Sequence, residues 1–309
     1  MDDQWLNFSF PDFSYAFLSV LLEGIPFLLL GTLLSGMIDQ FLPARLMTRF
    51  LPRNAYLAIL MSASLGIIFP MCECGIVPVI RRLMSKGLPI SSAIAYMLAA
   101  PIVNPIVAFS TYAAFRGQGA LEMTALRLGI GWLVAIIVGM AGGNLAVRYV
   151  IKTTILRQII EGNESSHGGD MMGGMRFRLG QALRVAMRDF LDVTVYFVLG
   201  VAIASLFNTA INQSAILPLA LNDWLATSSL MGLAFILSLC STTDAFIAAT
   251  FVAFPAASKL AFLVLGPMLD IKLLFLYSSI FTKRFVFGLS VALFLLIGLI
   301  CIRLSFFLY

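Results

Sequence analysis

The sequence predicts an all-α polytopic membrane protein with about eight membrane segments. Hydrophobic residues make up 61% of the chain and charged residues 11%, whereas about a quarter of a soluble domain is charged. The mean hydropathy is +0.99. Apolar stretches of about 18 residues or more, long enough to cross hydrocarbon as helices, recur along the chain: Tyr15–Ile38, Asn54–Met71, Leu88–Phe115, Leu128–Val147, Val193–Asn222, Trp224–Thr243 and Phe285–Ile302.

The N-terminus carries no pattern of a cleavable signal peptide. Residues 1–5 are acidic rather than basic, and the first apolar stretch is longer than a signal-peptide core. We therefore expect Tyr15–Ile38 to remain as the first membrane span.

The basic residues predict the orientation in the membrane. Fifteen of the 20 lie in four segments, residues 45–53, 81–86, 148–188 and 283–284, which the positive-inside rule places in the cytoplasm. We therefore expect a multi-pass protein of the inner membrane with its N-terminus outside and residues 149–188 inside. The net charge of +5 is explained by this topology, and we expect the bilayer, not nucleic acid, as the partner.

The segment between the first two basic loops must enter and leave the membrane from the same side. Its centre, Phe69–Pro78, contains two prolines and a glycine, which break helices. Irregular backbone at membrane depth is tolerated where it packs in protein or lines a wet cavity. We therefore expect a re-entrant hairpin here, with Pro78 beginning its descending half-helix.

An internal repeat divides the chain into a first transmembrane repeat (1–148), a cytoplasmic linker (149–188) and a second transmembrane repeat (189–309). An odd number of crossings in each half makes the second copy inverted, a construction typical of secondary transporters. The matched positions are Glu23 with Asp192, Gly31 with Gly200, Cys72 with Cys240, Pro89 with Pro255, Pro101 with Pro267, and Asn104 with Asp270.

The linker contains a glycine-, serine- and methionine-rich segment, residues 161–175, that is typical of a flexible connection. A weak soft-metal site formed by His167 with Met171, Met172 and Met175 is the alternative interpretation. His167 is the only histidine of the chain, which excludes a histidine-liganded zinc enzyme or a histidine relay within the membrane. We expect no cofactor.

Cys72-Glu73-Cys74 is the sharpest local motif. In an extended backbone, side chains two residues apart point to the same side, and thiolates suit soft cations and thiophilic metalloids. We interpret Cys72, Glu73 and Cys74 as substrate-binding residues. The alternative is that the cysteines pack as small hydrophobic residues.

The second predicted hairpin tip surrounds Cys240, which would add a third sulfur to Cys72 and Cys74 for a metal or metalloid. Ser241, Thr242 and Asp244 follow it. A helix that begins within the membrane is a site for polar groups, so these residues are substrate-binding candidates. The alternative is a capping box, in which Ser241 caps the half-helix and Asp244 reaches back to the cap.

Carboxylates inside apolar stretches are functional-site hypotheses by default, because they cost roughly 2.5–3.5 kcal/mol at the helix centre. The ion-coupling candidates are Glu23, Glu73, Asp192, Asp244 and Asp270. Lys272 offers Asp270 a nearby cation, although residues two apart do not face each other on a helix. Asn104, between two prolines, either binds substrate or satisfies free backbone groups.

The motifs Cys72-x-Cys74-x3-Pro78, Ala100-Pro101-x-x-Asn104-Pro105 and Leu239-Cys240-Ser-Thr-x-Asp244-Ala-Phe246 resemble the ArsP-like family of predicted permeases over nearly the whole chain. The resemblance implies an eight-segment bacterial permease of the cytoplasmic membrane. It also implies efflux of trivalent organoarsenicals with thiol ligands, a role that falls on Cys72 and Cys74, with Cys240 as a further ligand.

The preferred hypothesis is a secondary transporter, not an enzyme, that exports a small thiophilic solute such as a trivalent (organo)arsenical or a soft metal ion. No P-loop motif occurs, so we expect no energy source within the chain. The alternatives are a membrane thiol redox protein and a non-transporting membrane subunit of a larger complex. A second copy of the chain or an accessory membrane or periplasmic subunit is the expected protein partner.

Overall fold

The computed structural model describes residues 10–42, 52, 54–143, 145–153, 175–210 and 223–308. Regular structure in this part of the chain is helical, apart from one isolated bridge between Ile151 and Phe281. The all-α class is therefore confirmed. The helices in chain order are α1 (Phe10–Phe41), α3 (Ala55–Ser64), η1 (Leu65–Ile67), α4 (Glu73–Ser85), α5 (Ile90–Ala99), α6 (Pro105–Ala114), α7 (Ala120–Gly143), α8 (Val147–Val150), α10 (Met175–Ala210), α11 (Asp223–Leu237), α12 (Asp244–Thr250), α13 (Ala256–Met268), α14 (Ile271–Ile280) and α15 (Lys283–Leu308).

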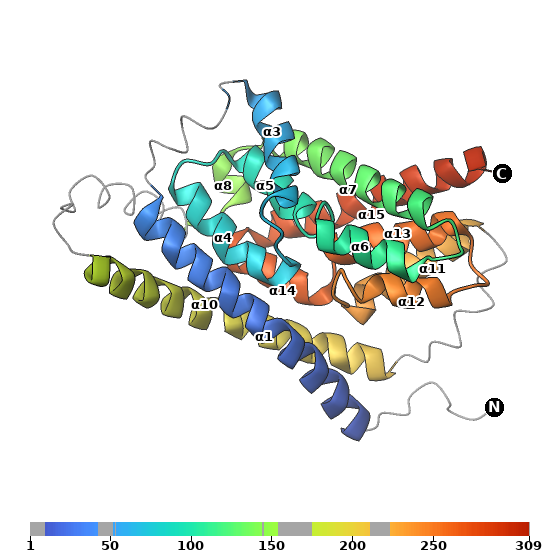
Figure 1. Cartoon of the computed structure of the whole chain (residues 1–309), viewed down its shortest axis with the longest axis horizontal. Helices are drawn as coiled ribbons and strands as arrows, with labels where there is room; N and C mark the ends of the chain where they lie inside the picture. The colour runs from blue at the N-terminus through green and yellow to red at the C-terminus, as the bar shows by residue number, and fades with distance from the viewer. Residues whose placement is uncertain are drawn as a thin grey trace.

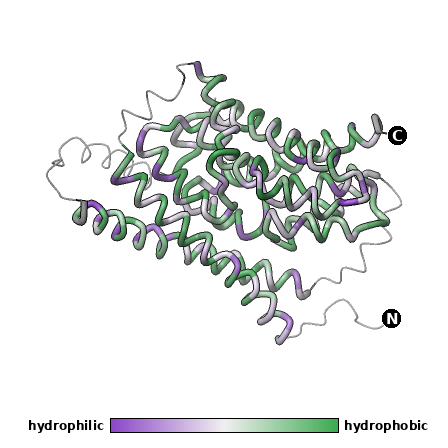
Figure 2. Tube along the Cα trace, viewed as in Figure 1, coloured by the Kyte–Doolittle hydropathy of each residue, from purple (hydrophilic) through white to green (hydrophobic). Residues whose placement is uncertain are grey.

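The chain is a multi-pass membrane protein. Five described helical segments are long and apolar enough to cross a bilayer: Phe10–Phe41, Ala120–Gly143, Phe177–Thr209, Ala256–Ile280 and Lys283–Ser305. Large apolar side chains of α1, α10 and α15 are exposed on the outside, among them Leu22, Leu191 and Phe287. Exposed apolar surface of this extent is typical of a membrane-facing protein. Figure 2 shows hydrophobic residues along all of these helices.

Helices α1 and α10 cross along one side of the helical body (Figure 1), with α4 packed on α1 and α14 packed on α10. Glycines make these close approaches possible. A Cβ atom at Gly31 would lie 2.4 Å from the Gly75 carbonyl oxygen of α4, and one at Gly24 would lie 2.2 Å from the Phe197 ring of α10. The beginning of α4 is thus held against α1, backbone to backbone.

The second half repeats the helix order of the first: α1, α3, α4, α5, α6 and α7 are followed by α10, α11, α12, α13, α14 and α15. The packing repeats as well, because α5 contacts α3 and α7 as α13 contacts α11 and α15. Pro89 and Pro255 precede α5 and α13 with similar backbone angles, φ −58° and ψ 146° against φ −56° and ψ 149°. Both prolines therefore precede a helix in the same backbone conformation.

The fourth and fifth helices of each half, α5 and α6 or α13 and α14, are joined by a cap of the same kind. Asn104 precedes α6 in extended backbone and accepts a hydrogen bond from the Ile106 amide at 2.9 Å. Asp270 precedes α14 in the same way and accepts one from the Leu273 amide at 2.6 Å. Both side chains accept a hydrogen bond from an amide of the first helical turn, which has no partner within its helix. The structure thus shows Asn104 as a helix cap, and its role in substrate binding stays a prediction.

The two predicted tips are breaks between helices. In the first half the break follows η1, and α4 begins at Glu73 after an extended Cys72 with φ −77° and ψ 163°. The expectation that Pro78 begins this helix is wrong, because Pro78 lies inside α4. A proline there removes the one hydrogen bond to the Cys74 carbonyl, and α4 continues through it.

The second break follows α11 and runs from Ser238, whose φ of 50° is left-handed, to Thr243. Helix α10 begins at Met175 and therefore includes residues 175–188, which the sequence assigned to the linker. The residues of the alternative soft-metal site, His167, Met171 and Met172, lie outside the described part of the chain.

Candidate functional site

A pocket of about 220 Å³ lies where the two breaks meet α1, α10 and α14. Its wall contains three of the four cysteines, two glutamates and one lysine. The lining residues are Ser19, Val20, Glu23, Gly24, Phe27, Cys72, Glu73, Cys74, Phe197, Ser238, Leu239, Cys240, Thr243 and Lys272. A volume below the roughly 300–1,000 Å³ of drug-sized sites suits a small solute.

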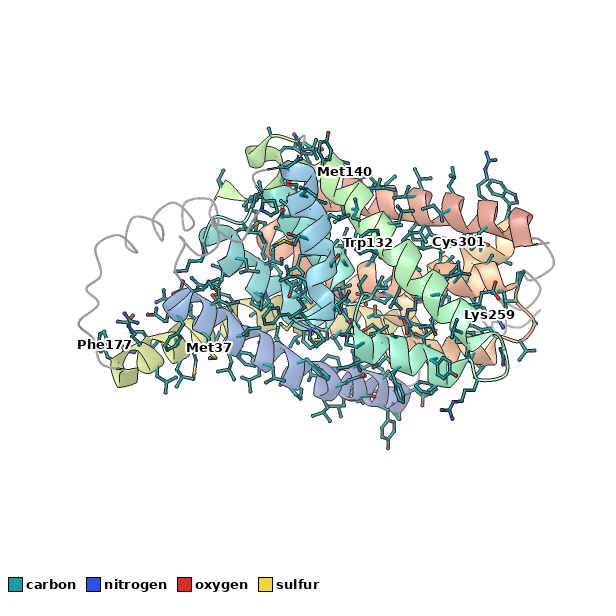
Figure 3. All side chains as sticks on the ribbon, turned by 45° about the horizontal axis from the view of Figure 1, so that its top comes forward. Met37, Trp132, Met140, Phe177, Lys259 and Cys301 are labelled. Atoms are coloured by element: carbon teal, nitrogen blue, oxygen red, sulfur yellow. The ribbon has the colours of Figure 1, made fainter. Side chains whose placement is uncertain are left out.

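The thiols of the pocket differ in access. Cys72 and Cys240 are partly buried, whereas Cys74, one residue into α4, is 5% exposed. Cys301, labelled in Figure 3, belongs to α15. It is not among the residues that line the pocket. Within the described residues, no three His, Cys, Asp or Glu side chains are arranged as a ready metal site. Cys72 and Cys240 are thus the accessible thiols, one from each break.

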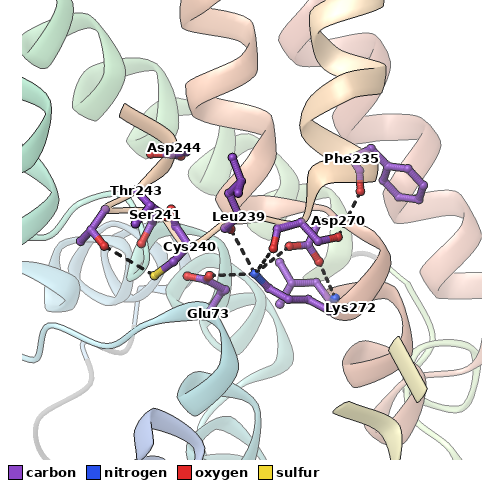
Figure 4. Close-up of polar contacts among 12 residues, drawn as sticks. Glu73, Phe235, Leu239, Cys240, Ser241, Thr243, Asp244, Asp270 and Lys272 are labelled. Atoms are coloured by element: carbon purple, nitrogen blue, oxygen red, sulfur yellow. Dashed lines mark hydrogen bonds and ion pairs between the residues drawn. The ribbon is translucent and has the colours of Figure 1, made fainter. Parts of the chain in front are cut away.

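The Lys272 ammonium lies between the two breaks, as Figure 4 shows. It is 3.2 Å from Asp270 Oδ2 and 3.3 Å from Glu73 Oε1. The expectation that Asp270 and Lys272 do not face each other is wrong: Asp270 is the extended cap before α14, so the angular spacing of a helix does not apply to the pair. Glu73 is 1% exposed, and its Oε2 accepts no hydrogen bond within the described chain.

A second buried ion pair joins Arg127 of α7 to Asp244 of α12 at 2.7 Å. Arg127 also donates to the Thr111 hydroxyl at 2.8 Å and to the Ser241 carbonyl at 3.0 Å, and it is fully buried. The predicted capping box is wrong, because α12 begins without a side-chain cap and the Asp244 carboxylate is turned to Arg127. A guanidinium holds a carboxylate more strongly than a cap amide does.

Both ion pairs connect the two halves of the chain. Glu73 at the first break is paired with Lys272 of the second half, and Asp244 at the second break is paired with Arg127 of the first half. The position of each break therefore depends on the other half.

A charged cluster lies at the other end of α4, between α1 and α10. Asp189, 1% exposed, accepts hydrogen bonds from Ser35 Oγ at 2.8 Å and from Arg82 Nε and Nη2, each at 2.9 Å. Arg81 is 3.6 Å from Asp192, whose side chain is 54% exposed. The cluster consists of Ser35, Asp39, Arg81, Arg82, Lys86, Asp189 and Asp192. It fixes the C-terminal end of α4, whose N-terminal end forms the pocket.

The predicted site residues fall into two groups. Glu23, Cys72, Glu73, Cys74 and Cys240 line the pocket. The others have different neighbours: Asn104 and Asp270 cap helices, Asp192 belongs to the charged cluster, the Ser241 carbonyl and Asp244 hold Arg127, and the Thr242 hydroxyl is 3.6 Å from Cys240 Sγ.

The sequence reasoning missed Arg127 and Asp189, and it expected Lys272 not to face Asp270 and gave it no contact with Glu73. Arg127 directly precedes the apolar stretch Leu128–Val147, and Lys272 lies within the apolar segment Ala256–Ile280. A basic residue beside or within an apolar segment predicts a buried ion pair, because a buried charge requires a partner.

The sequence is similar to a family of predicted permeases and to two curated bacterial proteins. Residues 10–305 match the ArsP_1 family model, which is described as a predicted permease. The UPF0718 protein YcgR of Bacillus subtilis is 41% identical over 280 residues, 90% of this chain and 92% of the relative. A Streptococcus mutans protein, named as a two-component membrane permease complex subunit, is 36% identical over 272 residues, 87% of each chain. No solved structure matches the chain. The chain belongs to the ArsP_1 family of predicted permeases.

Proposed function

We propose that the protein is a secondary transporter that exports a small thiophilic solute, such as a trivalent organoarsenical or a soft metal ion. The observation that carries the proposal is the pocket into which both breaks bring thiols: Cys72 and Cys74 from the first and Cys240 from the second. Sulfur ligands select soft cations and metalloids. Cys72 and Cys240 are the first ligands because their side chains are accessible.

The charge of the pocket favours a neutral or cationic solute over an anion. Its ionisable wall groups besides the thiols are the Glu23 and Glu73 carboxylates and the Lys272 ammonium. The ammonium has three N–H donors, and it contacts the Ser238 and Leu239 carbonyls as well as two carboxylates. The ammonium therefore has no donor left for an anionic solute, and the ionisable groups of the wall carry excess negative charge.

The transport cycle in this proposal is alternating access between two inverted repeats. Eight membrane segments result when the units α3–α4 and α11–α12 count as re-entrant hairpins and the pairs α5–α6 and α13–α14 count as one segment each. The matched caps at Asn104 and Asp270 support the repeat. In this proposal the charged cluster lies on the cytoplasmic side of a bacterial inner membrane and the N-terminus lies outside, as the positive-inside rule favours for the basic loops. Glu23 and Glu73 in the pocket wall are the remaining ion-coupling candidates.

Transport into proteoliposomes tests the proposal. Purified protein is assayed with a panel of methylarsenite, arsenite, copper(I), zinc and sulfite, in vesicles with and without an imposed proton gradient. We expect transport of one or more of the thiophilic solutes and none of sulfite. The variant Cys72→Ser/Cys240→Ser should lose about tenfold or more of the rate, because losing as little as 1.4 kcal/mol of binding has that effect. Cys301→Ser, outside the pocket, is the matched control.

Equal rates in the double variant and in Cys301→Ser would remove the thiol-ligand proposal and leave the permease. Absence of transport of the whole panel by wild-type protein would favour a second candidate, a subunit that needs another chain. The Streptococcus mutans relative, whose printed name describes one subunit of a two-component permease complex, motivates this candidate. Co-expression with a partner chain should then restore transport.

A further inference from the structure

Four oxygen atoms surround the Lys272 ammonium at the centre of the two breaks. The main-chain carbonyls of Ser238 and Leu239 accept hydrogen bonds from Nζ at 2.8 and 3.0 Å. Asp270 Oδ2 and Glu73 Oε1 lie 3.2 and 3.3 Å away. Figure 4 shows the ammonium at the meeting point of these contacts. The oxygen cage consists of Ser238 O, Leu239 O, Asp270 Oδ2 and Glu73 Oε1.

The cage has the chemistry of a site for a hard monovalent cation. Hard cations take oxygen ligands from carboxylates and main-chain carbonyls. Ser238 and Leu239 follow the last residue of α11, where the carbonyls lack helical partners and the helix dipole is negative. In transporters with broken helices, such C-terminal ends coordinate the coupling cation. In this protein the Lys272 ammonium contacts those C-terminal carbonyls of α11, where such transporters bind the cation.

The charge balance explains why a cation must be present. Glu73 and Asp270 are 1% and 0% exposed, and the Lys272 ammonium is the cation paired with both. Two buried carboxylates without it would carry a large desolvation penalty. Glu73 Oε2 lacks a hydrogen-bond partner within the described chain, so a cation that moved slightly in the cage would find a further ligand.

We propose that Lys272 is a tethered cation in an ion site shared by the two breaks, in the place that a dissociable Na⁺ takes in a cation-coupled carrier. The proposal rests on the proposed function as a secondary transporter. The bound charge cannot leave, so this site does not bind Na⁺ in the wild-type protein. The ammonium also contacts both Glu73, at the start of α4, and the carbonyls that follow α11. These contacts hold the two thiol-bearing breaks together at one pocket.

Lys272→Ala tests the proposal, because it empties the cage and leaves its oxygen ligands. Thermal unfolding of the purified protein is measured at equal ionic strength in chloride salts of Na⁺, K⁺, methylammonium and the bulky N-methylglucamine cation. Wild-type protein should show the same Tm in all four. The variant should gain about 5 °C or more in Na⁺ or methylammonium relative to N-methylglucamine, the size of shift that a saturating ligand produces.

Two further variants keep the test decisive. Lys259→Ala removes another buried lysine, which is not part of the cage, and should show no cation-specific shift. Lys272→Ala/Glu73→Gln has the same formal charge in the cage as wild type; it should still respond to small cations, and adding Asp270→Asn should abolish the response. This double variant is measured if Lys272→Ala aggregates.

A Tm that is equal in the four salts for Lys272→Ala, or for the double variant where the single one aggregates, would overturn the proposal. Transport is not the readout, so this result is independent of the thiol-ligand test: a cation response with no loss of transport in Cys72→Ser/Cys240→Ser would retain the ion site and reject the thiol ligands.

Discussion

Arg127→Met is expected to lower the free energy of unfolding by about 3–5 kcal/mol, the usual cost of breaking a buried ion pair. The reason is that the Asp244 carboxylate stays buried without its guanidinium partner. Asp244 is 2% exposed and accepts from Arg127 at 2.7 and 3.0 Å, so the variant buries an unpaired negative charge. The Ser241 carbonyl and the Thr111 hydroxyl also lose their donor. Denaturant titration of the purified protein in mixed micelles measures the difference.

The double variant Arg127→Met/Asp244→Leu is the control for that prediction. It removes both charges, and replacing a buried pair by apolar residues is often neutral. We therefore expect it to recover most of the stability lost in Arg127→Met. The account of this pair is contradicted if the double variant is as unstable as the sum of the two single variants, because the interaction energy would then be zero.

Asp189→Asn is expected to raise the rate at which a membrane-impermeant maleimide, added from the side of the basic loops, modifies Cys72. Asp189 holds Arg82 through two hydrogen bonds of 2.9 Å and is buried. Its neutralisation loosens the C-terminal end of α4, whose N-terminal end follows Cys72. A loss of about 1.4 kcal/mol from a charged hydrogen-bond pair opens the pocket about tenfold more often.

Asp192→Asn is the matched control for this second prediction. Asp192 belongs to the same cluster and the same helix, but its side chain is 54% exposed and lies 3.6 Å from Arg81. Exposed ion pairs contribute only about 0–1 kcal/mol, so the labelling rate should change little. Inside-out vesicles of a protein that keeps Cys72 as its only cysteine give the rates. If the two substitutions changed the labelling rate equally, the buried Asp189–Arg82 contact would not be what restricts access to Cys72 from the side of the basic loops.

Local features of the fold were predictable from the sequence, because they depend on neighbouring residues. Asn104 and Asp270 were matched by position alone, and both are helix N-caps in extended backbone. Cys72 and Cys240 were expected at breaks, and both lie there, since proline, glycine and serine-threonine runs interrupt helices whatever the tertiary context. Four of the five long apolar segments follow from composition in the same way, whereas Ala256–Ile280 was not among the predicted stretches.

The pairing across the two halves was not predictable from such features. Arg127 and Asp244 are 117 residues apart, and no spacing rule connects them. The capping box at Ser241 and Asp244 was a sound local pattern that a distant guanidinium overrode. The Asp270–Lys272 contact was missed for a different reason: the two-residue spacing was judged as if both residues lay in the helix, whereas Asp270 is its cap.

The central claim is that one solute binds between a thiol of each break. It is tested most directly by native mass spectrometry of Cys74→Ala/Cys301→Ala protein, which keeps Cys72 and Cys240, after reaction with phenylarsine oxide. Two thiols replace the oxo group of the arsenical, forming two As–S bonds and releasing water. We predict one arsenical per protein, retained against excess monothiol and removed by a dithiol, and its loss when either Cys72 or Cys240 is also replaced by serine. An adduct that a monothiol removes, or one that survives in either serine variant, would contradict the claim.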